Sequence, residues 1–94
     1  GRPGAIEHDV DPRDVAAAVQ GHDVTLAWTN AGAASAFLLH VGVAPGQTAL
    51  TVPIAGQSRA AFAGVPPGTY YVRVRGANVF GIGRPSTEVR VDVP

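Results

Sequence analysis

Apolar and polar side chains alternate with a period of two in several short segments of this 94-residue sequence. The alternation is clearest at residues 70–75, where Tyr70, Val72 and Val74 are separated by Tyr71, Arg73 and Arg75. Successive side chains of a β-strand point to opposite faces, so this segment predicts a strand with one face in a core. No segment shows a sustained helical period of 3.6 residues. The sequence therefore predicts an all-β protein.

Six further segments carry similar alternation, and turn-forming residues separate them. The seven predicted strands lie at residues 15–19, 24–28, 36–41, 50–54, 60–62, 70–75 and 89–93. Seven short strands with closely spaced turns are typical of a two-layer β-sandwich. Pro53 lacks a backbone N–H, which predicts an edge position for the strand at 50–54.

A tight corner, Val65-Pro66-Pro67-Gly68, precedes the strand at 70–75. Tyr70 shares the inward face of that strand with Val72. Its hydroxyl is therefore expected to bond back to the corner backbone, as in the tyrosine corner of Greek-key sandwiches.

Three features together give the chain a family resemblance. They are the corner with Tyr70, the tryptophan Trp28, and the closing pattern Gly81…Pro85-Ser86…Glu88-Val89. With them the chain resembles a bacterial-type fibronectin type III domain from about Val15 to Val93. The resemblance implies a seven-stranded immunoglobulin-like β-sandwich with Trp28 buried on the second strand.

Residues 1–13 are predicted to form an N-terminal linker or tether, and residues 14–94 the fibronectin type III-like domain. The tether carries Glu7, Asp9 and Asp11, which with Asp14 offer oxygen ligands of the kind that Ca²⁺ prefers. It lacks the glycine and the final glutamate of a helix–loop–helix calcium loop. A solvated acidic linker is the preferred interpretation, with a calcium-bridged junction as the alternative.

Charge and composition exclude several classes of protein. Seven basic side chains balance seven acidic ones, whereas nucleic-acid-binding domains are usually basic. No apolar run approaches the ~20 residues of a membrane span. The chain has no cysteine, so it forms no disulfides. His8, His22 and His40 fall on different predicted elements and lack the spacing of a metal site. We expect no metal and no cofactor.

Two segments superficially match catalytic or nucleotide-binding motifs. Gly56-Gln57-Ser58-Arg59-Ala60 approaches a hydrolase nucleophile elbow, but a predicted strand follows Ser58 where the motif needs a helix. Gly81-Ile82-Gly83 opens like a dinucleotide loop, yet it lies between two predicted strands. Neither motif has its required context, so no catalytic residue is assigned.

The outer face of the predicted sheet formed by strands 36–41, 70–75 and 89–93 is the first candidate interaction surface. Strand parity places there Leu38, His40, Tyr71, Arg73, Arg75, Glu88, Arg90 and Asp92. Tyrosine and arginine are enriched at binding hot spots. The alternative is a solvated face with cross-strand ion pairs, such as Arg73 or Arg75 with Glu88 or Asp92.

The loop at residues 77–86 is the second candidate surface. It holds Val79, Phe80 and Ile82 between glycines, although exposed apolar side chains are unusual in a solvated loop. Phe80 either folds back to cap the core or contacts a partner. The loop lacks the Arg-Gly-Asp integrin motif found in animal members of the family.

The resemblance implies a non-catalytic module, a spacer or protein–protein interaction domain of a larger extracellular or cell-surface protein. Its expected partners are neighbouring domains of the same polypeptide and a protein or polysaccharide ligand. The alternative is an accessory carbohydrate-binding or linker module of a secreted polysaccharide-degrading enzyme. For that role only Tyr71 and Phe80 offer candidate aromatic rings.

Overall fold

The computed structural model describes residues 12–30, 34–79 and 81–94. The predictions for Glu7, His8, Asp9, Asp11 and Phe80 lie outside these residues. The described part of the chain forms eight strands. They are β1 (Arg13–Gln20), β2 (Asp23–Thr29), β3 (Ala36–Gly42), β4 (Leu50–Ala55), β5 (Arg59–Phe62), β6 (Gly68–Asn78), β7 (Gly81–Ile82) and β8 (Val89–Val93).

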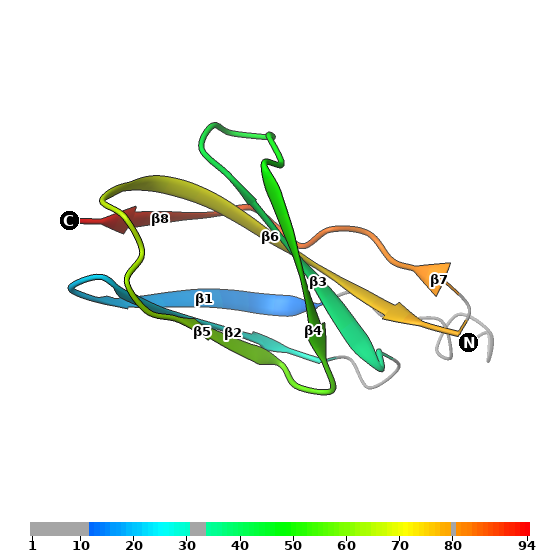
Figure 1. Cartoon of the computed structure of the whole chain (residues 1–94). Helices are drawn as coiled ribbons and strands as arrows, with labels where there is room; N and C mark the ends of the chain where they lie inside the picture. Colours follow the sequence, from blue (N-terminus) through cyan, green and yellow to red (C-terminus); the bar gives the residue numbers. More distant parts are fainter. Residues whose placement is uncertain (1–11, 31–33, 80) are drawn as a thin grey trace.

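The strands form two antiparallel sheets that face each other (Figure 1). One sheet has the order β1-β2-β5; the other has the order β4-β3-β6-β7, with β8 also paired to β6. β1 begins at one end of the sandwich and β8 finishes at the opposite end (Figure 1). This two-layer arrangement confirms the predicted immunoglobulin-like β-sandwich.

The inward positions of the alternating pattern form one apolar core. Its buried members are Val24, Leu26, Trp28, Phe37, Leu39, Ala60, Val72, Val74, Val91 and Val93. Trp28 is 5% exposed and meets Phe37 of the other sheet edge to face, with 5.2 Å between ring centroids. Aromatic pairs prefer such a geometry, and this pair ties the two sheets together.

The corner before β6 has the geometry that its sequence predicts. The Tyr70 hydroxyl donates a hydrogen bond of 2.7 Å to the carbonyl of Pro66. Gly68 has a φ of 152°, a conformation that favours glycine. The hydroxyl bond and the glycine together hold the loop from β5 against the start of β6.

Two features differ from the sequence prediction. β6 extends to Asn78 and then pairs with the short strand β7, through Ala77 opposite Ile82. The segment expected to be a plain loop thus contains an eighth, two-residue strand, since backbone pairing continues where the apolar alternation has ended.

In β1, Asp14 has a φ of 54° and the register with β2 shifts between Arg13 and Ala16, which marks a bulge. β1 itself begins at Arg13, next to the predicted domain boundary.

Candidate interaction surface on the five-stranded sheet

Pairing of β3, β6 and β8 brings the predicted outer-face residues together. His40 lies opposite Arg73, and Leu38 lies opposite Arg75. Tyr71 lies opposite Arg90 of β8, and Thr69 lies opposite Asp92. We call the side chains of Leu38, His40, Tyr71, Arg73, Arg75, Arg90 and Asp92 the outer face. Arg90 and Asp92 are exposed, whereas the other five are half-buried.

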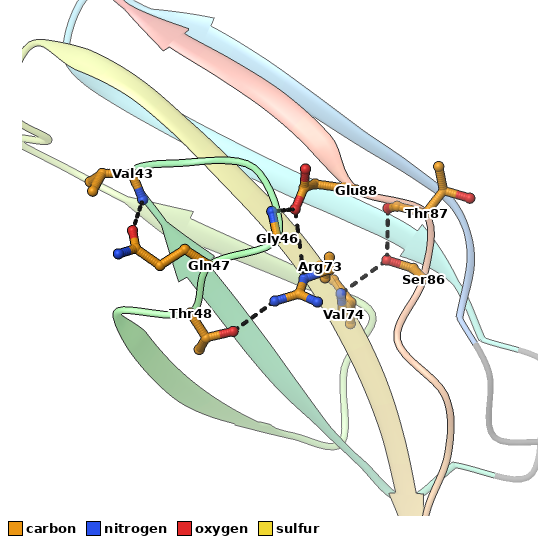
Figure 2. A network of polar contacts seen from close by, with 9 residues as sticks. All are labelled: Val43, Gly46, Gln47, Thr48, Arg73, Val74, Ser86, Thr87 and Glu88. Carbon is orange, nitrogen blue, oxygen red and sulfur yellow. Dashed lines mark hydrogen bonds and ion pairs between the residues drawn. The ribbon is translucent and has the colours of Figure 1, made fainter.

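The loop between β3 and β4 contributes to this burial (Figure 2). Gly46 N donates to Glu88 Oε2 at 2.8 Å, and Arg73 Nη2 donates to Thr48 Oγ1 at 2.7 Å. A Cβ added to Gly42 would lie only 2.0 Å from the backbone oxygen of Gln47, so the loop returns directly against the end of β3. The loop is thus hydrogen-bonded to β6 through Arg73 and to the segment before β8 through Glu88.

A second covering segment, residues 83–88, runs beside β6. Ser86 N donates to the carbonyl of Val74 at 2.8 Å, and Val74 N donates to Ser86 Oγ at 3.0 Å (Figure 2). Arg75 Nε donates to the carbonyl of Gly83 at 3.0 Å. This segment continues the edge of the sheet without being a regular strand, and it fixes the Arg75 side chain.

The ion pairs of the outer face agree only in part with the expected ones. Arg73 Nε lies 3.8 Å from Glu88 Oε2, as one of the expected pairs. Asp92 instead pairs with Arg90 of its own strand at 3.1 Å and accepts a hydrogen bond from the Thr69 hydroxyl at 2.8 Å. The Thr69 hydrogen bond, followed by the Arg90 contact, lowers the pKa of Asp92. The Asp92 hydrogen bond raises the pKa of Arg90.

His40 has a polar environment that favours its neutral form. Its Nδ1 lies 3.0 Å from Thr51 Oγ1 on β4, while its Nε2 is buried without a hydrogen-bond partner in the described structure. Burial lowers the pKa of His40, and the positive charges of Arg75 and Arg73 lower it further. Beside this imidazole a recess of about 270 Å³ is lined by His40, Thr48, Arg73, Arg75 and Pro85.

The hairpin β6–β7 exposes apolar side chains. Val79 is 93% exposed and Ile82 is 60% exposed. The prediction that Phe80 caps the core or contacts a partner lies outside the described residues. Val43 and Leu50 are two further exposed apolar side chains that the sequence did not single out.

Several residues of the surface were not predicted from the sequence. Gly46, Thr48, Thr51 and Pro85 reach the outer face from loops or from the neighbouring strand. Strand parity assigns faces only within a strand, so it gives no signal for loop residues. Pro45 and Gly46 are typical turn residues, but residue type does not indicate the surface on which a turn lies.

The two rejected motifs lie at strands, as the sequence predicts. Ser58 directly precedes the strand β5, and its carbonyl accepts a hydrogen bond from Trp28 N at 3.0 Å. Gly81 and Ile82 form β7. No group of three His, Cys, Asp or Glu side chains converges within residues 12–30, 34–79 and 81–94. In the same residues no helix has the length and apolarity needed to cross a membrane.

Comparison with known proteins identifies the fold. No family model matches the chain, and no curated protein matches it. Among solved structures it is similar to a Fn3-like protein from Clostridium thermocellum, with a TM-score of 0.78 and 20% identity over 88% of this chain and 91% of that one. It is also similar to the FN5 domain of Drosophila Lar, with a TM-score of 0.72 and 19% identity over 89% and 95% of the two chains.

A third similar structure contains several modules. The FN1–FN3 domains of chicken CNTN1 match with a TM-score of 0.75 and 19% identity, over 88% of this chain and 30% of that one. The chain therefore has the fibronectin type III fold, which confirms the resemblance found in the sequence.

Proposed function

We propose that the chain is a non-catalytic spacer and protein-interaction module of a larger extracellular or cell-surface protein. The observation that carries this proposal is that β1 begins and β8 finishes at opposite ends of the sandwich (Figure 1). Modules connected through such ends line up one after another, and the rigid core sets their spacing. The similarity to one part of the three-domain CNTN1 structure supports the same arrangement.

The neighbouring module is the partner that we propose for the exposed hairpin. β7 lies toward the end of the sandwich at which β1 begins (Figure 1). Val79 and Ile82 are therefore available to a module that precedes this one in the chain. An apolar contact at the junction would limit bending between the two modules, because relative domain motion is expected unless an interface is apolar.

A tandem of two copies of residues 1–94 tests this proposal. We expect X-ray scattering in solution to show an elongated particle whose maximum dimension is nearly double that of one copy. Val79→Ser combined with Ile82→Ser should increase the bending of the tandem and leave the melting temperature of a single copy unchanged. A matched control, Val43→Ser combined with Leu50→Ser, alters exposed side chains elsewhere and should not affect bending. A compact side-by-side tandem would contradict the proposal.

The carbohydrate-binding alternative has less support. Tyr71 is half-buried and lies opposite Arg90, so it does not offer a flat exposed ring. A binding screen of the single module against insoluble glucans and chitin distinguishes the two functions. We expect no retention; retention that Tyr71→Ala abolishes would favour the carbohydrate-binding function.

A further inference from the structure

The recess beside His40 gathers positive charge from two adjacent positions of β6. Arg73 and Arg75 are two residues apart and therefore project from the same face, and His40 lies opposite Arg73 on β3. Thr48 and Pro85, from the two covering segments, complete the wall. The volume of about 270 Å³ is sufficient for a small polyatomic ion, since one water occupies only about 30 Å³ of liquid.

Hydrogen-bonding groups at this recess remain unsatisfied. His40 Nε2 and Arg73 Nε are both buried without a hydrogen-bond partner among the described residues. Buried polar groups in folded proteins are nearly always paired, so these two atoms mark the recess as a polar site. Arg75 uses its Nε on the neutral carbonyl of Gly83. In the described part of the chain, no carboxylate lies within ion-pair distance of Arg75.

The charges around the recess do not balance. Two guanidinium groups face one carboxylate, that of Glu88, which lies near Arg73 and accepts from Gly46 N. The imbalance is one positive charge when His40 is neutral. A monovalent carboxylate matches this imbalance, and its two oxygens suit the planar N–H fork of an arginine. A phosphate dianion would exceed it unless His40 took up a proton.

We propose that this recess binds a carboxylate, presented by an acidic side chain of a protein partner. The protein partner rests on the interaction role proposed above, whereas the carboxylate site does not. Arg75 supplies the unbalanced charge and the planar N–H fork that binds the carboxylate, and the side chains of His40 and Arg73 line the same wall. Arg90, though on the same face, is already paired with Asp92 and takes no part.

Bound carboxylate would also change the titration of His40. The charged groups that face this imidazole are Arg73 and Arg75 of β6, with Glu88 beyond Arg73. Thr51 on β4 and Thr48 in the covering loop are neutral. A carboxylate in the recess offsets the two arginine charges that lower the pKa of His40. Binding should therefore raise that pKa, a change that a carboxylate bound elsewhere on the module would not cause.

The first experiment titrates the whole chain with sodium acetate, followed by NMR of the His40 imidazole and the arginine Nε groups. Sodium chloride at equal ionic strength provides the reference. We expect saturable shifts at His40 and Arg75, a dissociation constant in the millimolar range, and a higher pKa for His40. Arg75→Gln should abolish the saturation, whereas Arg90→Gln, which removes the same charge from the same face, should retain it.

Arg75→Lys provides a second test in case Arg75→Gln does not fold. Lysine keeps the positive charge but lacks the planar N–H fork of arginine, so acetate binding should weaken. Shifts that do not saturate in the native chain, or that are equal in Arg75→Gln or Arg75→Lys, would overturn the carboxylate site.

The second experiment identifies the source of the carboxylate. A blocked Ala-Glu-Ala peptide should displace acetate and bind at least as tightly, and Ala-Gln-Ala should not bind. Tighter binding of inorganic phosphate or of a sulfated polysaccharide at the same residues would overturn the assignment to an acidic side chain. If no anion binds at this recess, the carboxylate site is wrong, but the X-ray scattering result for the tandem is not affected. The carboxylate site and the spacer role can therefore fail separately.

Discussion

Tyr70 and Trp28 show how single side chains set the architecture. Both lie on the inward faces of their strands, and each joins its strand to a different part of the fold. Tyr70 fixes the corner through its bond to Pro66, and Trp28 meets Phe37 across the core. These positions could be predicted because large aromatic residues at inward sites of a period-2 pattern have few alternatives to burial.

Tyr70→Phe tests the corner bond. Removing the hydroxyl loses the 2.7 Å hydrogen bond to Pro66 but keeps the ring. We expect the free energy of unfolding to fall by about 1 kcal/mol, the usual net contribution of one hydrogen bond. Urea denaturation followed by tryptophan fluorescence provides the measurement. Tyr71→Phe serves as the control, since the structure gives its hydroxyl no hydrogen bond within the described residues; equal losses in both variants would contradict the assignment.

His40 makes stability depend on pH. Its pKa in the folded protein is below its ordinary value of 6.5, so the unfolded chain takes up the proton first as the pH falls. The free energy of unfolding should therefore be fully retained above 6.5 and should fall as the pH drops from 6.5 toward the folded pKa. Melting temperatures measured across this range should decline more steeply in the native protein than in His40→Gln. Parallel curves would show that His40 is not responsible.

Among the elements, the strands were easier to predict than their connections. β2, β3, β4 and β8 match the alternating segments closely because one face of each packs on the core. β7 could not be predicted, since Gly81 and Ile82 have no alternation and form a strand only because Asn78 and Ala77 of β6 are available for pairing. The bulge at Asp14 likewise depends on the local backbone rather than on side-chain pattern.

The candidate surface was predicted only as far as strand parity extends. Leu38, His40, Arg73 and Arg75 share a face as expected. Their partial burial follows from Thr48, Gly46 and Ser86, whose contacts depend on where two irregular segments lie in space. No local pattern encodes that position.

Gly42→Ala tests the packing of the covering loop. The new Cβ would lie 2.0 Å from the Gln47 backbone oxygen, so the loop must move. Overpacking of this kind costs about 1–3 kcal/mol, and displacement of the loop should also break the Arg73–Thr48 hydrogen bond. Thermal unfolding and amide hydrogen exchange at residues 43–48 measure both effects. Val43→Ala, in the same loop but exposed, should leave both unchanged; stability equal to the native protein in Gly42→Ala would contradict the packing.

The sandwich has an open side between β4 and β5, which are edge strands of its two sheets. Each of these strands pairs with one neighbour in the described sheets, β4 with β3 and β5 with β2. Unpaired edges invite association between copies, and proline limits it because it cannot donate to a new ladder. β4 is an edge strand, as Pro53 predicts, and we expect this proline to limit pairing of β4 with another copy.

Pro53→Val tests whether the proline limits association between copies. Restoring an N–H and a β-branched side chain to β4 makes its free edge competent to pair with another copy. We expect sedimentation velocity to detect dimers or larger species that increase with protein concentration. Pro45→Val changes a proline in the neighbouring loop and should remain like the native protein. A Pro53→Val variant that sediments like the native protein at every concentration would show that features other than Pro53 prevent pairing of the β4 edge.

A pulling force applied to Arg13 and Pro94 would act along β1 and β8 in opposite directions. β1 is bonded sideways to β2, and β8 is bonded sideways to β6, so the load would shear whole rows of hydrogen bonds at once. Rows loaded in this way must break together, whereas a hairpin opened from its end breaks one bond after another. We therefore expect the module to resist unfolding when it is pulled by its two ends.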